Sequence, residues 1–214
     1  MVVILLGLVA ILAGHDSSTK TLAGQTNGVQ VGGTSGATTS SAGGTAESTT
    51  PKLPKGALPQ YDANIDDPAV GMTIPKVTGK DFAGNDITIG PDGKAKIILF
   101  VAHWCPHCQR EVPLIKAHLD DHPMPNDVEL LTVSTAVHPG ADNYPPSAWL
   151  KRVGWPAPVL ADDEDSTVGA TYGLSAFPYF VVVDKDGKVV ERKTGEISTD
   201  EFDAAVKAAQ TGHT

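Results

Sequence analysis

Trp104-Cys105-Pro106-His107-Cys108 is the stretch that decides the fold, and it holds both cysteines of the 214-residue chain. The pattern predicts a helix that opens at Pro106, directly after an apolar strand. A cysteine at such a junction lies near the unpaired N–H groups and the positive dipole end of the helix, which favour a thiolate. Two intervening residues also bring both sulfurs within reach of a disulfide. The pair can therefore open and close as a redox dithiol.

Three other interpretations of the cysteine pair are open. A static disulfide across so short a loop removes little entropy from the unfolded chain, so it would stabilise the fold only weakly. A structural zinc site needs four ligands, and His103 and His107 are the nearest additions to the two thiolates. A copper-binding chaperone without turnover would add a histidine such as His103 or His138, since soft thiolates suit Cu(I). The strand before the pair and the helix after it favour the redox dithiol.

The composition divides the chain into three segments. Residues 1–14 are an uncharged apolar run, short for a bilayer span, so we expect a signal anchor or signal peptide. Residues 15–61 are mostly Gly, Ser, Thr and Ala, which cannot bury enough surface to offset the entropy of ordering. We expect them to be a disordered tether, and a tether favours the anchor because it holds a domain off a membrane. Residues 62–214 have the length of one globular domain.

Hydrophobic patterns predict an α/β domain in this third segment. The continuous apolar run at 97–102 predicts a central strand that is covered on both faces. Further strands are expected at 74–77, 87–89, 128–133, 177–183 and 188–192, and helices after Pro106, from Ser147 and over 200–209. The helix from Ser147 lies in an irregular insertion at 138–155, which serves either packing or partner recognition. A net charge of −9 argues against nucleic acid as a partner.

Outside the cysteine motif, two groups of polar residues are spaced so that they could bind a metal. His118 and His122 are four residues apart, but at the charged end of a surface helix we expect a solvated face. The acids at 162–165 do not match the spacing of an EF-hand loop, and helix N-termini attract acids. We expect these acids to cap a helix that leads to Tyr172. No metal and no cofactor are therefore expected.

The order of these elements resembles the thioredoxin fold in its TlpA-like form, the membrane-anchored, extracytoplasmic thiol-disulfide oxidoreductases of bacteria within the redoxin superfamily. The matching features cover residues 68 to about 208, behind the anchor and tether. They are Pro68-Ala69-Val70-Gly71, the cysteine motif with Arg110-Glu111-Val112-Pro113 behind it, and Tyr172-Gly173-Leu174 leading to Pro178 and Val181-Val182-Val183-Asp184. The resemblance implies a central mixed sheet flanked by helices, with an N-terminal hairpin and a helical insertion.

The resemblance also implies roles for four residues of the site. Cys105 would be the exposed nucleophile that forms a mixed disulfide, and Cys108 the buried thiol that resolves it. Pro178 would be the family's cis-proline, which lies against the cysteine pair and offers backbone groups to an extended substrate. Glu111 would be the acid that manages protons near the buried thiol. An ordinary surface acid is the alternative for Glu111.

Three further residues would shape the site and its redox poise. Trp104 would cap the site, and Phe177 stands where relatives carry a smaller Thr or Val, which alters the substrate groove. His107 would stabilise the Cys105 thiolate by a hydrogen bond or by charge, which makes the disulfide a stronger oxidant. Pro-His is also the dipeptide of DsbA. A DsbA-like oxidase is therefore open beside a TlpA-like reductase, and we expect an intermediate poise.

The resemblance implies protein partners and a membrane location. The substrates would be proteins with thiols or disulfides, and a membrane-embedded thiol carrier would recharge the site. We expect a monomer at the cell membrane, held by a single N-terminal anchor with its domain on the extracytoplasmic side, or a secreted protein if the signal is cleaved. A peroxidase of the related peroxiredoxin group is disfavoured, because it needs a Thr or Ser where this chain has Ala102.

Overall fold

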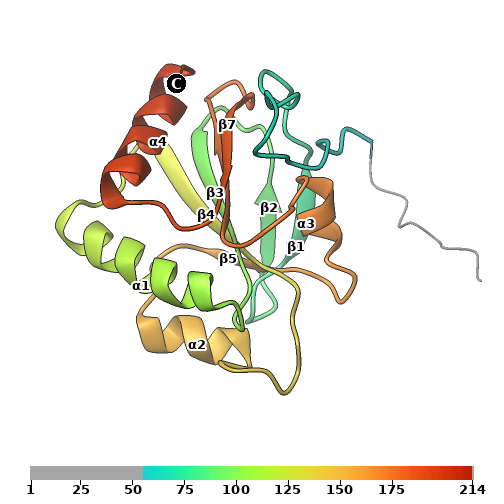
Figure 1. The fold of residues 1–214 in the computed structure, drawn as a ribbon, viewed down its shortest axis with the longest axis vertical. Coiled ribbons are helices and arrows are strands. Elements are labelled where there is room, and N and C mark those ends of the chain that lie inside the picture. The colour runs from blue at the N-terminus through green and yellow to red at the C-terminus, as the bar shows by residue number, and fades with distance from the viewer. Residues whose placement is uncertain (1–54, 214) are drawn as a thin grey trace, which may run out of the picture. The chain divides into compact units, whose positions relative to one another are not determined.

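A seven-stranded mixed sheet runs through residues 55–213, the part of the chain that the computed structural model describes (Figure 1). The strands are β1 (Val77–Lys80), β2 (Asp86–Ile89), β3 (Ala95–Val101), β4 (Val128–Ser134), β5 (Val159–Ala161), β6 (Tyr179–Val183) and β7 (Val189–Thr194). The helices are α1 (Pro106–Asp121), α2 (Pro146–Val153), α3 (Thr167–Thr171) and α4 (Thr199–Thr211). The predicted anchor at 1–14 and most of the predicted tether at 15–61 lie outside the described residues.

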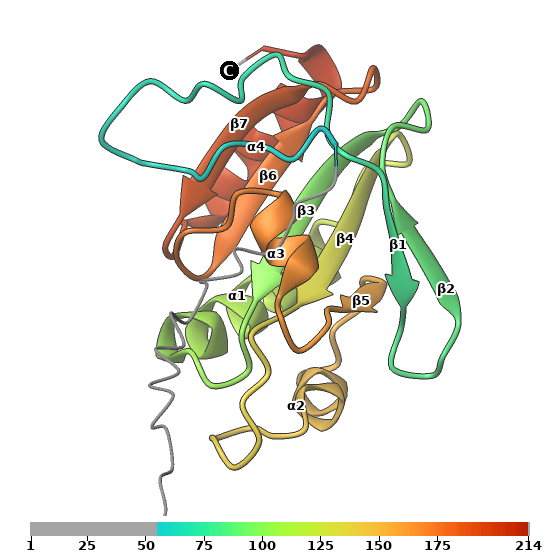
Figure 2. The ribbon, with the colours of Figure 1, turned by 90° about the vertical axis from the view of Figure 1, so that its right-hand side faces the viewer.

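The strand order is β2-β1-β5-β4-β3-β6-β7, which places β3 inside the sheet (Figure 2). β3 runs parallel to β4 and antiparallel to β6, so that Ile98 lies between Leu131 and Val181. Helices α1 and α4 cover one face of the sheet, and α3 lies on the other. The predicted mixed α/β sheet with flanking helices is confirmed. Within residues 55–213, the helices are all too short or too polar to cross a membrane.

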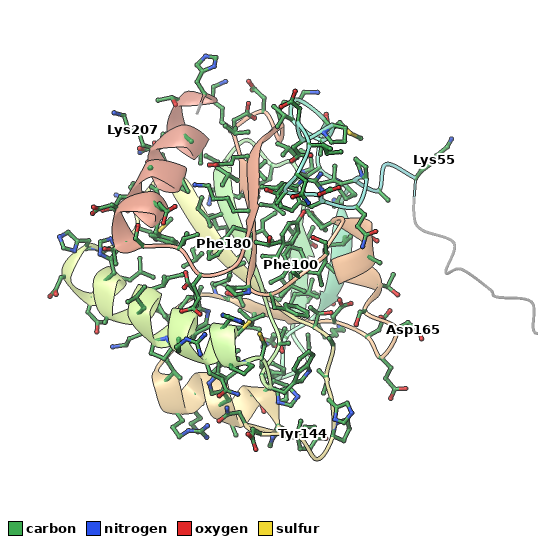
Figure 3. All side chains as sticks on the ribbon, in the orientation of Figure 1. Lys55, Phe100, Tyr144, Asp165, Phe180 and Lys207 are labelled. Atoms are coloured by element: carbon green, nitrogen blue, oxygen red, sulfur yellow. The ribbon has the colours of Figure 1, made fainter. Side chains whose placement is uncertain are left out.

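The central strand β3 is buried on both faces, as its continuous apolar run predicts. Ile97 and Leu99 join the apolar cluster beneath α1 and α4, whereas Ile98 and Phe100 join the cluster on the α3 side. Figure 3 labels one large aromatic residue from each cluster, Phe180 and Phe100, in the interior of the domain. Burying side chains on both faces fixes the position of the strand, and with it the loop that follows its last residue.

The N-terminal hairpin is joined to the central strands by β5, a three-residue strand that the sequence did not predict. Lys80 of β1 pairs with Ala161, and Val159 of β5 pairs with Thr132 of β4. The hairpin itself is confirmed, although its first strand begins at Val77 rather than at residue 74. A strand of this length next to Pro158 carries too few residues for a recognisable alternation.

The folded part begins before residue 62, so the predicted end of the tether at residue 61 is wrong. Leu58 is 2% exposed, and its N–H donates to the carbonyl of Thr171 at 2.9 Å. The N–H of Tyr61 donates to Gly173 in the same way, at 2.8 Å. The buried guanidinium of Arg192 donates to the carbonyl of Pro59 at 2.8 Å. Contacts with residues more than 100 positions away hold this segment, and its local composition gives no sign of them.

The two polar groups that could have suggested metal sites have structural partners instead. His118 is only 10% exposed at its side chain, and its Nε2 lies 2.7 Å from a carboxylate oxygen of Asp203 on α4. The predicted solvated face is therefore wrong for His118, because α4 packs beside this end of α1. Asp162 accepts hydrogen bonds from two N–H groups of α3, both at 2.9 Å, and Asp163 accepts a third at 2.8 Å. The predicted capping role is confirmed for Asp162 and Asp163, whereas Glu164 and Asp165 form no hydrogen bond to α3 among the described residues.

Candidate active site

The cysteine motif lies at the junction between β3 and α1. Cys105 is the N-cap residue of α1, with an extended backbone at φ −73° and ψ 121°, and Pro106 is the first helical residue. The carbonyl of Cys105 accepts the N–H of Gln109 at 3.0 Å, which is the first hydrogen bond of the helix. The sulfur of an N-cap residue lies near the positive end of the helix dipole, where negative charge is stabilised. This position favours a reactive thiolate at Cys105.

Both cysteines are free thiols that belong to the apolar cluster beneath α1. Cys105 is 6% exposed and Cys108 is fully buried. The exposed position expected for Cys105 is therefore wrong, because its N-cap geometry turns it into the cluster rather than toward solvent. Burial raises the pKa of the Cys108 thiol, and the nearby Cys105 and Glu111 raise it further. The two sulfurs thus occupy unequal environments.

Glu111 lies one helical turn after Cys108 and is only 1% exposed. Both of its carboxylate oxygens accept the N–H of Ile197, at 3.2 and 3.3 Å. Burial raises the pKa of Glu111 to about 7, against the opposing effect of that hydrogen bond. The alternative of an ordinary surface acid is wrong, since this carboxyl group is enclosed and can hold or release a proton near neutral pH.

Trp104, the first residue of the motif, is 38% exposed. Its Nε1 donates to the carbonyl of Ala136 at 2.7 Å, and its ring meets the ring of Phe177 edge-on, with centroids 6.0 Å apart. A hollow of about 530 Å³ borders the same loop. This hollow is lined by Val137, Pro139, Tyr144, Asp162, Asp163 and Glu164. Figure 3 labels Tyr144 in the long loop between β4 and α2.

Pro178 lies at the same end of the sheet as the cysteine motif. It directly precedes Tyr179, which pairs with Phe100 near the end of β3. The Phe177–Pro178 peptide bond is cis, and the Pro178 carbonyl accepts the N–H of Gly195 at 2.9 Å. The fold therefore brings residues 177–178 and the segment after β7 to the edge where α1 begins.

His107 is paired with a residue that the sequence did not indicate. Its Nδ1 lies 2.6 Å from Oε1 of Glu196, in the segment between β7 and α4. Nη2 of Arg110 lies 2.9 Å from the same Nδ1, so this nitrogen contacts both a carboxylate acceptor and a guanidinium donor. Hydrogen bonds from Arg110 and His107 lower the pKa of Glu196 to about 2. His107 was expected to act on Cys105 by a hydrogen bond or by charge, and the hydrogen bond is not formed among the residues that the structure describes.

His103 is fully buried and both of its ring nitrogens are occupied. Nδ1 donates to the carbonyl of Asp142 at 2.7 Å, and Nε2 accepts the N–H of His138 at 3.2 Å. This neutral imidazole ties the loop after β4 to the start of the motif. The zinc interpretation named His103 with His107, and the copper interpretation named His103 or His138. The two backbone partners of His103 leave it no free ligand atom. Across residues 55–213, no group of three or more His, Cys, Asp or Glu side chains is placed to hold a metal ion.

Sequence reasoning missed Glu196 because its partners are 86 and 89 residues away. No local spacing links it to the cysteine motif. The signal that existed was topological, since the segment after the last strand of this fold lies beside the first turn of α1. Glu111 carried a local signal, its distance of one helical turn from Cys108.

Comparison with known proteins agrees with this arrangement. The Redoxin family model matches residues 69–209. Thiol-disulfide oxidoreductase ResA of Geobacillus thermodenitrificans is 29% identical over 135 residues, which cover 63% of this chain and 74% of that protein. The solved structure of MTB DsbF in mixed oxidised and reduced forms is 28% identical, with a TM-score of 0.51, and covers 64% of this chain and all of the other. StoA of Bacillus subtilis has the same fold, with a TM-score of 0.52 at 24% identity, over 64% of this chain and 98% of the other. The chain therefore belongs to the Redoxin family, as a thioredoxin-fold thiol-disulfide oxidoreductase.

Proposed function

We propose that this chain is an extracytoplasmic oxidoreductase that passes electrons to protein disulfides through Cys105 and Cys108, as a TlpA-like reductase. The observation that carries the proposal is the unequal setting of the two thiols on α1. Cys105 caps the positive end of the helix, whereas Cys108 is fully buried with an enclosed acid one turn away. One sulfur is suited to attack, and the other to stay protonated until it is needed.

The reaction follows from these two settings. The Cys105 thiolate attacks one sulfur of a substrate disulfide, so that the substrate S–S bond breaks and its second sulfur leaves as a thiolate. Cys108 then loses its proton and attacks Cys105, and the mixed disulfide opens to release the remaining substrate thiolate. The substrate gains two electrons and takes up two protons, and the chain is left with a Cys105–Cys108 disulfide. A membrane thiol carrier would return the two electrons.

Glu111 is the proton acceptor that the second step needs. The buried Cys108 thiol must lose its proton to attack, and burial makes that loss unfavourable. A carboxyl group with a pKa of about 7 can accept the proton at neutral pH and later give it up. The hydrogen bond from Ile197 holds this carboxylate at its position inside the domain.

The substrate would lie across the edge formed by Trp104, Phe177 and Pro178. The edge-on pair of Trp104 and Phe177 offers an apolar surface, and the hollow beside Val137 can take a side chain near the substrate cysteine. Its acidic lining favours a basic or neutral side chain there.

The Pro-His dipeptide supports a DsbA-like oxidase as the second candidate. The contact between His107 and Glu196 favours the reductase. An imidazole held by a carboxylate stabilises the Cys105 thiolate less than an imidazole without such a partner does. For the cellular setting, the apolar run at 1–14 and the polar segment behind it support a monomer anchored at the cell membrane with its domain outside the cytoplasm.

Replacing Cys108 should trap the substrate on the chain. In the full-length Cys108→Ala variant incubated with insulin, we expect a covalent adduct at Cys105 that dithiothreitol releases, because the resolving thiol is missing. Intact mass spectrometry measures the adduct. Cys105→Ala is the matched control and should form none. Equal trapping by both variants, or no trapping although the wild type reduces insulin, would contradict the assigned roles.

The direction of electron flow can be read from the redox potential. Equilibration of the purified chain with glutathione buffers, followed by alkylation and mass measurement, should give a potential below about −250 mV for a reductase. A value near −120 mV, that of DsbA, would instead assign the oxidase.

The raised pKa of Glu111 should appear in the pH dependence of stability. Its pKa is about 7 in the folded chain and about 4.3 when unfolded. Between these pH values the folded chain binds more protons, so its stability falls as pH rises. Relative to Glu111→Gln, we expect the wild type to lose about 2 kcal/mol of unfolding free energy from pH 4 to pH 8.

Urea unfolding of the reduced proteins measures this difference. Glu164→Gln is the matched control, since Glu164 is exposed and should give a difference that does not change with pH. A Glu111→Gln difference that is equally flat would show that Glu111 titrates as a solvated acid.

A further inference from the structure

The carboxylate of Glu196 contacts two basic side chains from the first turns of α1, those of His107 and Arg110. Oε1 of Glu196 lies 2.6 Å from Nδ1 of His107 and 2.5 Å from Nη2 of Arg110. Nε of Arg110 also donates to both carboxylate oxygens, at 3.0 and 3.2 Å. Nη2 of Arg110 lies 2.9 Å from Nδ1 of His107, so the three groups form one compact cluster. The cluster joins α1 to the segment between β7 and α4.

The two basic side chains belong to the first turns of the helix that Cys105 caps. His107 stands between the two cysteines in sequence, and Arg110 follows it by one helical turn. Glu196 is the main cause of the raised pKa of Arg110, and the charge of Cys105 contributes as well. A negative charge on Cys105 therefore acts on Arg110, and by reciprocity the guanidinium favours the thiolate. The Glu196 carboxylate already contacts both basic side chains, and this contact limits how far they stabilise the thiolate.

The other acids that lie near α1 have different partners. Glu111 is enclosed and accepts the N–H of Ile197. Glu201 accepts hydrogen bonds from the N–H and the hydroxyl of Ser198 in the capping box of α4. Asp203 is paired with His118 near the far end of α1. Glu196 is thus the acid that this part of the described chain directs at the cysteine motif.

We propose that Glu196 is a positioning residue for the redox reaction: it holds His107 by a hydrogen bond and Arg110 by an ion pair, and thereby keeps the disulfide less oxidising than the Pro-His dipeptide alone would make it. The inference rests on the proposed exchange through Cys105 and Cys108. In this proposal Glu196 shifts the equilibrium between the dithiol and the disulfide without contacting either sulfur.

The sign of the effect follows from which redox state carries the charge. The thiolate exists only in the reduced form, so any cation freed beside Cys105 stabilises the dithiol relative to the disulfide. A more stable dithiol makes the disulfide a stronger oxidant. Removing the Glu196 charge should therefore shift the equilibrium with glutathione toward the dithiol. Because the side chain of Glu196 is 36% exposed, solvent screens part of the effect.

The test compares redox equilibria of full-length Glu196→Gln and wild type in glutathione buffers at pH 7. We expect the equilibrium constant to move toward the dithiol by roughly threefold to tenfold, which corresponds to about 15–30 mV. Asp186→Asn is the control for loss of one negative charge, since Asp186 lies in the β6–β7 turn and is paired with Lys185. Asp186→Asn should leave the constant unchanged. Glu196→Asp, which keeps the charge, should restore most of the wild-type value.

A chain that lacks both partners of Glu196 shows whether Glu196 acts through His107 and Arg110. In a His107→Gln/Arg110→Gln chain, adding Glu196→Gln should change the constant by less than about twofold, because the cations that it would free are gone. An unchanged constant in the single variant, a shift toward the disulfide, or an equal shift in the chain that lacks both partners would overturn the proposal. Failure of the proposed function looks different, since the wild-type chain itself would then not equilibrate with glutathione.

Discussion

The chemistry of this chain depends on one constraint, the direct passage from a fully buried strand into the first turn of a helix. β3 is fixed by apolar contacts on both faces and by hydrogen bonds to β4 and β6. Its end therefore leaves little freedom to the residues that follow, and Cys105 becomes the N-cap of α1. The unpaired N–H groups and the dipole of the helix then face the sulfur without any added cofactor.

The second sulfur takes its properties from the same helix. Cys108 lies one turn inside, among apolar side chains that disfavour its charged form. Two adjacent residues after β7 then act on opposite sides of this turn. The N–H of Ile197 holds the buried Glu111, and the carboxylate of Glu196 pairs with the exposed His107. A short segment far along the chain thus contacts both the proposed proton acceptor of Cys108 and the basic side chains at the start of α1.

The sequence predicted the features that depend on local patterns. The apolar run of β3, the helix opening at Pro106 and the helix predicted from Ser147 can be read from neighbouring residues, and the structure confirms them. Features that depend on distant partners could not be predicted. Cys105 is less exposed than expected because the fold turns it into the apolar cluster, and the ion pair of His107 forms only when the end of β7 meets α1.

The N-terminal boundary illustrates the same limit. Composition alone assigned residues up to 61 to a tether. In the structure, however, the buried Arg192 donates a hydrogen bond to the carbonyl of Pro59 and so holds this segment against the domain. The guanidinium also pairs with Asp67, so that one buried cation on β7 orders two stretches of the preceding chain. A buried charge requires such partners, and they can come from any part of the chain that reaches it.

The roles proposed for Cys105 and Cys108 require that two thiols one helical turn apart differ in reactivity, because one caps the helix and the other is enclosed beneath it. Competitive alkylation of the fully reduced chain with isotope-coded iodoacetamide at pH 7, read by peptide mass spectrometry, measures both sulfurs in one experiment. We expect Cys105 to be labelled at least about tenfold faster than Cys108, and the difference to disappear in denaturant. Equal labelling in the folded chain, or faster labelling of Cys108, would contradict it.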